Sequence, residues 1–389
     1  MISAVSGQDS AYVKRKVSES DIKVLFSYYT QNGDHSAVTG GTGTEKLQVY
    51  SPQVIYSHKI DSANTIIFDA GVDFITSAST DRIDYNMSSA SYKDDHFALS
   101  AGYSHYFRKP RIELGLTGSA AMESDFLSGG FNLWFNHTDK AGMTSYYAGF
   151  QAFFDDLRWG RLNPDYRRPV TLVYPVELRD TSWFDTYMRY SYNLNIGIER
   201  VINRRMSIGF FPGLIIQTGL LSTPFHRVYF QEQDSARVEN LPTQRIKIPL
   251  GIKFNTYIGA SFILNTFYRF YIDDFDILSN TMELKAFYKV TPTITPSLSL
   301  RLYQQTGSKY FLPYKEHLLT ETYYTSDYDL SAFYSVKAGA GLRFAPFKRI
   351  FGSWAFDEIE MMYYYYRRSD GLQAHFISTY FGIKALSGH

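Results

Sequence analysis

Apolar and polar residues alternate over long stretches of this chain. Residues 245–255 (RIKIPLGIKFN) carry an apolar side chain at every second position, with charged or small residues between them. Residues 186–199, 281–290 and 330–344 repeat the pattern. A period of two residues predicts β-strands with one apolar face. Strands of soluble proteins are usually about 5–6 residues long, whereas these stretches have the length of strands that cross a bilayer at a tilt.

The alternating stretches follow one another along the chain, separated by two kinds of connection. Short turns such as RKP, TDK and INRR alternate with longer polar loops such as residues 32–44, 155–183 and 220–243. This arrangement is typical of outer-membrane barrels. We therefore predict an all-β fold, a single transmembrane antiparallel β-barrel of about 16 strands with short periplasmic turns and long extracellular loops. The predicted strands are residues 20–31, 45–58, 64–77, 95–107, 111–122, 126–137, 142–154, 184–201, 206–219, 244–256, 260–273, 279–290, 293–305, 329–344, 353–367 and 372–386.

The same series indicates one domain. We expect the barrel to occupy residues 20–389, after a flexible periplasmic segment over residues 1–19. The small residues from Ala4 to Gly7 resemble the end of a signal peptide, but the basic and apolar regions of such a peptide are missing. A signal-peptide remnant up to about residue 7 and an ordinary flexible terminus therefore both stay open. An even number of strands places both termini on the periplasmic side.

Four consecutive tyrosines stand in residues 360–371 (EMMYYYYRRSDG). On a strand these side chains divide evenly between the two faces. The face without carboxylates is predicted to contact lipid, so Tyr363 and Tyr365 are assigned to an aromatic girdle near the outer boundary of the membrane. The other two tyrosines then point into the lumen.

Composition supports a barrel and excludes several other classes of protein. The chain has 389 residues, with 33 Tyr and 30 Phe but no Cys. Its most apolar stretch, residues 208–221, is interrupted by Gly, Pro and Gln, so it is not a membrane helix of about 18 apolar residues. A formal net charge of +1 gives no general affinity for nucleic acid. The absence of Cys excludes disulfides and thiolate metal sites.

One segment resembles a known family. GVDFITSASTDRID (residues 71–84), followed by residues 87–105, is similar to a family of bacterial outer-membrane β-barrel proteins of unknown function. In that family the strand ends in an acidic residue and a Thr/Ser-Gly/Ala-Ser run, which Asp73 and residues 76–79 match here. The Gly-Ala-Ser-Pro form of some members is absent. The resemblance implies an outer-membrane location, with a small lipoprotein or a flavin-handling enzyme as a neighbour, and assigns no reaction.

The inward face is predicted to carry most of the charged residues of the strands. A basic wall is expected on the later strands, with carboxylates on the third and fifteenth. One interpretation is a wet pore with a transverse field that favours anionic or zwitterionic solutes. The alternatives are charges that pair across the lumen and help to plug it, and a lumen filled by a partner. The basic wall consists of Arg245, Lys247, Lys253, Arg269, Lys285, Lys289, Arg301 and Lys337, and the acidic residues are Asp69, Asp73, Glu358 and Glu360.

Signs of catalysis are few. The sequence contains no G-x-S-x-G, H-E-x-x-H or Walker A pattern, and the nine histidines show no metal-ligand spacing. We therefore predict no catalytic site, no cofactor and no protein-bound metal. Asp69, Asp73 and His96, from neighbouring strands, are the one trio that we would test for catalysis. Calcium binding by the acidic loops STDRID and YKDDH stays open, although solvated loops of this kind are common.

Two classes of function follow. The first is an integral barrel of the bacterial outer membrane that acts as a channel or transport component for small solutes, including anions. The second is a scaffold barrel with a plugged lumen that holds a small lipoprotein or another periplasmic protein. An outer-membrane enzyme is a distant third. Membrane lipids are a partner in every case.

Overall fold

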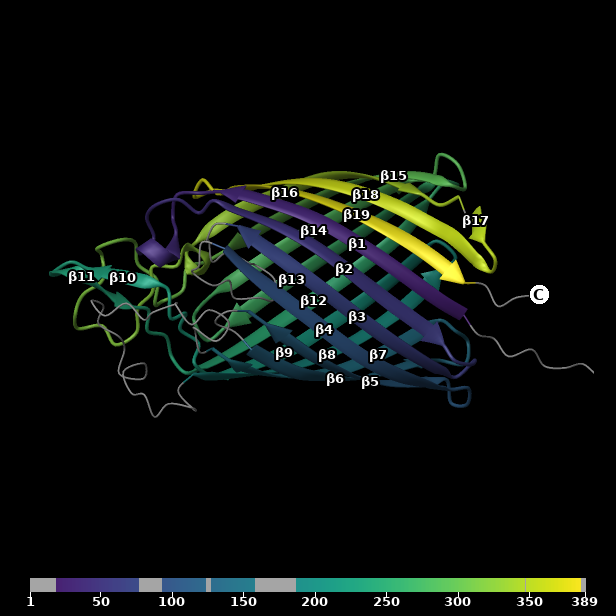
Figure 1. The fold of residues 1–389 in the computed structure, drawn as a ribbon, viewed down its shortest axis with the longest axis horizontal. Coiled ribbons are helices and arrows are strands. Elements are labelled where there is room, and N and C mark those ends of the chain that lie inside the picture. Colours follow the sequence, from purple (N-terminus) through teal and green to yellow (C-terminus); the bar gives the residue numbers. More distant parts are fainter. Residues whose placement is uncertain (1–18, 77–92, 124–126, 158–186, 347, 386–389) are drawn as a thin grey trace, which may run out of the picture.

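The computed structural model describes residues 19–76, 93–123, 127–157, 187–346 and 348–385 of the 389-residue chain. These residues form a barrel with a cluster of loops at one end (Figure 1). The barrel strands are β1 (Glu19–Asn32), β2 (Leu47–Lys59), β3 (Asn64–Thr76), β4 (Lys93–Phe107), β5 (Ile112–Met122), β6 (Leu127–Thr138), β7 (Thr144–Asp156), β8 (Met188–Asn203), β9 (Met206–Gly219), β12 (Gln244–Ile258), β13 (Phe262–Asp273), β14 (Leu278–Tyr288), β15 (Ile294–Gln305), β16 (Phe333–Phe344), β18 (Trp354–Arg368) and β19 (Gln373–Ala385).

The strands close into a ring. Each barrel strand pairs antiparallel with the next one along the chain, and β1 pairs with β19 from Ser20↔Ala385 to Asn32↔Gln373. Closure leaves no strand edge, so the backbone donors and acceptors of every barrel strand have neighbours on both sides. The predicted single transmembrane antiparallel barrel of about 16 strands is confirmed.

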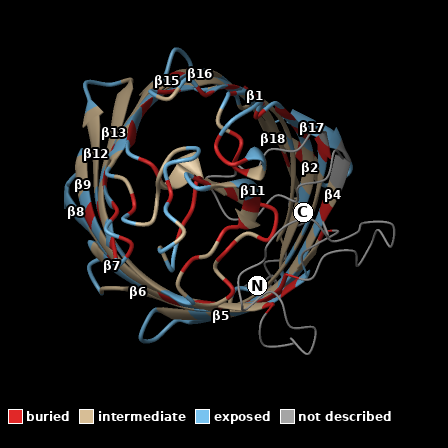
Figure 2. Cartoon of the chain, turned by 90° about the vertical axis from the view of Figure 1, so that its left-hand side faces the viewer, coloured by how far each residue is buried: buried red, intermediate tan, exposed pale blue. Residues whose placement is uncertain are grey.

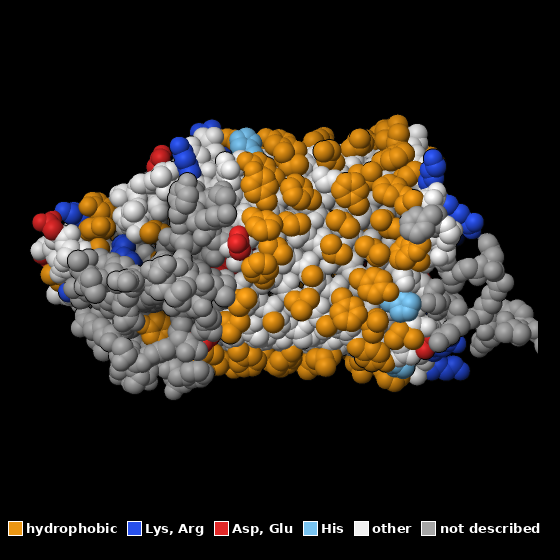
Figure 3. Space-filling view, in the orientation of Figure 1, with side chains coloured by type: hydrophobic (Ala, Val, Ile, Leu, Met, Phe, Trp, Pro, Cys, Tyr) orange, Lys and Arg blue, Asp and Glu red, His pale blue; other side chains and the backbone are white. Residues whose placement is uncertain are grey.

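Side chains alternate across the barrel wall as the sequence predicts. Apolar residues such as Leu99, Ile252, Leu298 and Met361 are among the most exposed large side chains of the barrel. A band of hydrophobic side chains covers the face of the barrel seen in Figure 3, and the charged side chains on this face lie mainly at or beyond the two ends of the band. This exterior is the apolar belt that a barrel presents to lipid.

The two ends of the barrel differ. The first strand begins and the last strand ends at the end that carries the short turns, and the long loops gather at the opposite, outer end (Figure 1). The loop 220–243 contains a hairpin of β10 (Arg227–Phe230) and β11 (Gln233–Val238) that the sequence analysis missed. The turn before β18 likewise contains a short strand, β17 (Lys348–Phe351). Both pieces are too short to give a clear alternating pattern.

Some expectations concern residues that the structure does not describe. They are the periplasmic segment over most of residues 1–19, the run at residues 77–79, the loop STDRID, and the greater part of the loop 155–183. Among the described residues, no helix is long and apolar enough to cross a membrane. The regular helical pieces that the structure describes are single 3-10 turns, η1 (Ala37–Thr39) and η3 (Tyr328–Leu330).

The assignment of alternate side chains to lipid and to the lumen can be tested at the middle of β12. Replacing Ile252, which is exposed on the barrel exterior, by Arg should lower the free energy of unfolding by about 2–4 kcal/mol, because the charge would lie in hydrocarbon. The matched control is Lys253→Gln at the next position, which faces the lumen and should change stability little. Urea unfolding of both variants in lipid vesicles measures the difference. Equal destabilisation by the two substitutions would contradict the assignment of the faces.

Candidate functional site in the lumen and its cap

The outer half of the lumen encloses a cavity of about 980 Å³. Its walls come from β1 to β9, β12, β13 and β19, and its roof comes from loop residues Thr223, His226 and Asp327. The wall includes many small polar side chains, among them Ser27, Ser100 and Ser191, as well as charged ones. Apolar side chains such as Phe153, Ile215 and Phe376 line it as well, so the cavity offers both polar and apolar contacts.

An acidic wall lies on β3. Asp73 accepts a hydrogen bond from Ser51 Oγ (2.5 Å), and its other oxygen lies 2.9 Å from His96 Nδ1. Asp69 accepts two hydrogen bonds from Gln53 Nε2, at 2.8 and 2.9 Å. Both carboxylates line the cavity.

The trio considered for catalysis is only partly assembled. Asp73 and His96 are in contact, whereas Asp69 is bonded to Gln53. Ser51 completes a Ser, Asp and His set, but the carboxylate lies between the hydroxyl and the imidazole. Nucleophilic catalysis requires the imidazole to accept the proton of the hydroxyl. This order of residues therefore differs from that of a Ser-His-Asp triad.

The members of the predicted basic wall make different kinds of contact. Three of its members form ion pairs with neighbouring carboxylates, and two lie over aromatic rings. The ion pairs are Arg245 with Asp273, Lys253 with Glu199 and Lys285 with Glu283. The ring contacts are Lys289 Nζ at 5.3 Å from the Tyr257 centroid and Lys337 Nζ at 4.5 Å from the Tyr364 centroid. Arg301 stands opposite Glu283 on one neighbouring strand and Lys337 on the other.

Two basic side chains remain for the cavity. Lys247 of β12 and Arg269 of β13 both line it, and neither forms an ion pair within the described residues. The Nε of Arg269 is buried without a hydrogen-bond partner among these residues. A positive charge in a partly enclosed site is stabilised by water or by an anion. These two residues are the members of the predicted basic wall that line the cavity.

The acidic and basic walls face each other. In the ring of sixteen strands, β13 is eight strands away from β3, by way of β4 to β9 and β12. Asp69 and Asp73 therefore lie across the lumen from Arg269, and all three line the same cavity. Opposed walls of opposite charge produce an electric field across the lumen.

The remaining predicted residues lie elsewhere on the fifteenth barrel strand, β18. Glu358 pairs with Arg343, and Glu360 is the register partner of Arg343; neither lines the cavity. Tyr363 is exposed on the exterior, and its hydroxyl lies 2.8 Å from His375 Nδ1. The hydroxyl of Tyr365 donates to Gln373 Oε1 at 3.1 Å.

Three loops cover the outer mouth of the barrel. We call residues 33–46, 220–243 and 306–332 the cap, and Figure 2 shows its loops and β11 crossing the opening of the ring. Val228, Phe230 and Tyr324 form a buried core between two of these loops. The third loop joins them through the stacked rings of His35 and Tyr328, whose centroids are 3.9 Å apart. The cap is thus a packed unit.

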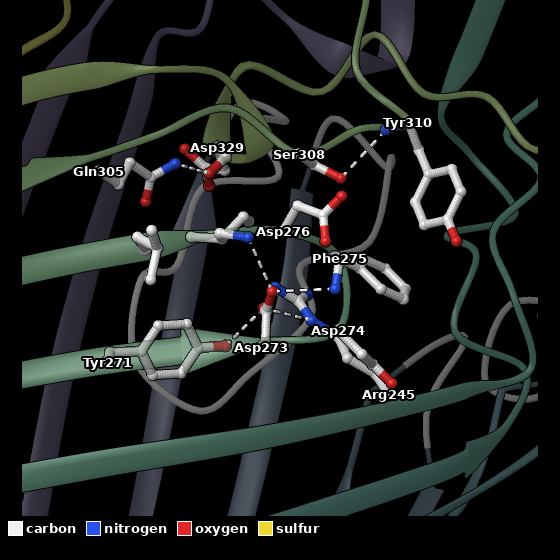
Figure 4. A network of polar contacts seen from close by, with 12 residues as sticks. Arg245, Tyr271, Asp273, Asp274, Phe275, Asp276, Gln305, Ser308, Tyr310 and Asp329 are labelled. Atoms are coloured by element: carbon white, nitrogen blue, oxygen red, sulfur yellow. Dashed lines mark hydrogen bonds and ion pairs between the residues drawn. The ribbon is translucent and has the colours of Figure 1, made fainter.

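Charged groups at the strand ends anchor the cap to the barrel. Arg245 Nε donates to Asp273 Oδ2 at 2.9 Å, and Asp273 Oδ1 accepts from the backbone of Phe275 and Ile277, in the turn between β13 and β14 (Figure 4). Lys309 of the cap donates its backbone N–H to the carbonyl oxygen of Phe275 at 3.1 Å and so ties the cap to this turn. Arg368, at the end of β18 and 2% exposed, pairs with Asp329 and Asp370. It contributes a second anchor.

The sequence matches a known protein family. Residues 84–376 match the family model described as "Protein of unknown function (DUF3570)". The chain belongs to the DUF3570 family. The resemblance seen in the sequence is therefore confirmed, although the match begins after the run at residues 76–79. A search of curated proteins found no match.

Solved structures share the general architecture of this DUF3570 barrel at low sequence identity. A bacterial polysaccharide outer membrane secretin has a TM-score of 0.49 and 10% identity, covering 96% of this chain and 99% of that one. The outer membrane protein opdK from Pseudomonas aeruginosa has a TM-score of 0.42 and 8% identity, covering 94% and 98%. The TodX monoaromatic hydrocarbon channel has a TM-score of 0.39 and 7% identity, covering 96% and 91%.

The cap of this DUF3570 member contains a group that the sequence analysis did not identify. His226, Glu239 and Asp327 bring their donor atoms within 4.8 Å of one another. The spacing of these residues, 13 positions and then 88 positions further along the chain, gives no recognisable metal motif. Only the packing of two cap loops brings them together.

A buried carboxyl in the cap makes the stability of this DUF3570 member depend on pH. Burial is the largest effect on Glu45 and raises its pKa from 4.5 to about 7, although the positive charge of Arg368 opposes this shift. The native state therefore holds more protons than the unfolded state between these values, so stability falls as pH rises through this window. The loss amounts to at most about 3 kcal/mol.

Glu45→Gln mimics the neutral carboxyl and should remove this loss. At pH 8 the backbone amides of residues 33–46 should exchange with deuterium more slowly in the variant than in the wild type. At pH 5, where Glu45 is largely protonated, the two proteins should exchange alike. Hydrogen-exchange mass spectrometry at each pH makes the comparison, and a variant less protected at pH 8 would contradict the assigned pKa.

Proposed function

We propose that this protein is a channel of the bacterial outer membrane through which small anionic or zwitterionic solutes cross. The observation that carries the proposal is the cavity with opposed charged walls in the lumen of a transmembrane barrel. A lipid-facing apolar exterior and a polar interior support passage of water-soluble molecules, because the polar lining replaces part of the hydration of a solute.

The charge distribution specifies the class of solute. The carboxylate of a solute would interact with Lys247 and Arg269, the two cavity-lining cations without an ion pair among the described residues. A positive group on the same solute would interact with Asp69 and Asp73 on the opposite wall. The field across the lumen would orient a zwitterion with its charges toward these walls.

The cap supports a regulated channel rather than a permanently open one. Its loops cross the outer mouth (Figure 2), and roof residues His226 and Asp327 complete the cavity. Entry from outside would require the loops to move apart. Cap opening would then control the conductance, while the barrel wall determines selectivity.

A second candidate function is a scaffold barrel that holds a small lipoprotein or another periplasmic protein. The covered outer mouth and the several lumen charges that already form ion pairs favour it, because both features reduce the open cross-section. In this case the purified barrel alone would not conduct. Planar-bilayer recording of the barrel therefore separates the two candidates.

We predict that the conducting barrel prefers anions at low salt and that added salt reduces this preference by screening the wall charges. Lys247→Gln should shift the reversal potential in a KCl gradient toward cation preference. It should also weaken block of the current by a small carboxylate such as acetate by about tenfold, the effect of losing one charged hydrogen bond.

The matched control is Lys285→Gln. It removes the same charge from the lumen, but its side chain pairs with Glu283 and does not line the cavity. The control should leave acetate block close to that of the wild type. If both substitutions, or neither, change the block, Lys247 does not bind the solute. A barrel that never conducts would instead favour the scaffold function.

A further inference from the structure

A mixed nitrogen and oxygen donor set lies in the roof of the cavity. His226 and Glu239 come from the loop between β9 and β12, and Asp327 comes from the loop between β15 and β16. His226 Nδ1 lies 3.4 Å from Glu239 Oε1 and 3.7 Å from Asp327 Oδ2. The three side chains are the one group of metal-ligating residues with this proximity in the described part of the chain.

The spacing of these atoms fits a central ion better than direct hydrogen bonds. Charge-assisted hydrogen bonds have lengths of roughly 2.7–2.9 Å, and His96 contacts Asp73 at 2.9 Å in the same barrel. The contacts of His226, at 3.4 and 3.7 Å, are longer. Metal–ligand bonds of about 2.0–2.2 Å in a tetrahedral site separate neighbouring donor atoms by about 3.3–3.6 Å. The observed separations are close to this range.

Burial and charge also call for a cation at this position. Glu239 is 2% exposed and His226 is 5% exposed. Two carboxylates that share a buried site repel each other unless a positive charge lies between them.

The surrounding groups hold the donors in place. Glu239 Oε1 accepts a hydrogen bond from Thr325 Oγ1 (2.5 Å), and Glu239 Oε2 accepts one from the backbone N–H of Thr223 (2.7 Å). Asp327 Oδ1 accepts from the backbone N–H of Asp329 at 2.9 Å, which leaves Oδ2 directed at His226. Outer hydrogen bonds of this kind orient the ligands of metal sites and raise their affinity.

We propose that His226 Nδ1, Glu239 and Asp327 Oδ2 bind one divalent transition-metal ion, such as Zn²⁺, in the roof of the lumen. One imidazole nitrogen and two carboxylates suit Zn²⁺ and its neighbours in the transition series, whereas Ca²⁺ and Mg²⁺ prefer oxygen ligands alone. Three protein ligands leave a fourth position open. His226 and Asp327 line the cavity, so water or a solute carboxylate can occupy that position from the lumen side.

The proposed ion would join two cap loops. Two of its ligands belong to residues 220–243 and the third to residues 306–332, so the bound metal opposes separation of these loops. Metal binding therefore stabilises the cap in the closed position by mass action. This inference concerns binding in the cap and holds whether or not the barrel conducts.

Titration of the purified, chelator-treated full-length barrel in detergent with Zn²⁺ and with Co²⁺ tests the proposal. Calorimetry should give one site per chain, and bound Co²⁺ should give the intense visible absorption of a tetrahedral site. His226→Ala should abolish this site. Glu239→Gln and Asp327→Asn, which keep the shape and the hydrogen-bond acceptors, should each weaken binding at least about tenfold.

His375→Ala is the control, because His375 is an exposed histidine on the barrel exterior that contacts Tyr363; it should bind metal like the wild type. Thr325→Val should weaken binding about 10- to 100-fold by releasing Glu239. Heat-modifiable migration on gels verifies that each variant is folded. If His226→Ala fails to fold, Glu239→Gln and Asp327→Asn test the metal site instead. Stoichiometric binding that survives both amide substitutions, or a wild type that binds no more tightly than these variants, would overturn the proposal.

Discussion

The closed ring of backbone hydrogen bonds is the constraint on which the rest of the structure depends. Inside hydrocarbon an unpaired N–H or C=O group costs several kcal/mol, because no water can replace the missing partner. The pairing of β1 with β19 removes the last free edges. Once the ring is closed, the period of two residues places alternate side chains toward lipid and toward the lumen, and this alternation explains the apolar exterior and the polar cavity together.

The sequence predicts the parts of the fold that the bilayer constrains. β12 is long and alternates strictly, so its faces follow from residue parity; β18 does the same after the irregularity between Phe356 and Glu358. The hairpin β10–β11 escaped prediction because a cap loop lies outside hydrocarbon and its strands of four and six residues need no such pattern. Residue parity does not show which side chains form ion pairs across strands. It assigns Lys247 and Lys253 to one face, but only the register between strands shows that Lys253 pairs with Glu199. The donors His226, Glu239 and Asp327 meet through the tertiary packing of loops, which no local spacing encodes.

The lumen and the cap divide the electrostatic roles between them. Most of the basic residues on the later strands are neutralised by carboxylates or covered by rings, which spares the barrel the cost of like charges in an enclosed space. Lys247 and Arg269 are the exceptions that face the cavity, opposite the carboxylates of β3. Above them the cap carries its own charged groups, so the roof responds to protons or cations while the wall acts on solutes.

The most direct test of this account is the accessibility of alternate positions on β12. Because the chain contains no cysteine, single cysteines at each of residues 245–254 can be labelled without background in intact vesicles. A charged thiol reagent that cannot enter lipid should modify the odd-numbered positions, including 247 and 253, and leave the even-numbered ones unmodified. Modification of the even-numbered positions instead, or of none in either set, would contradict a water-filled lumen enclosed by this face of the barrel.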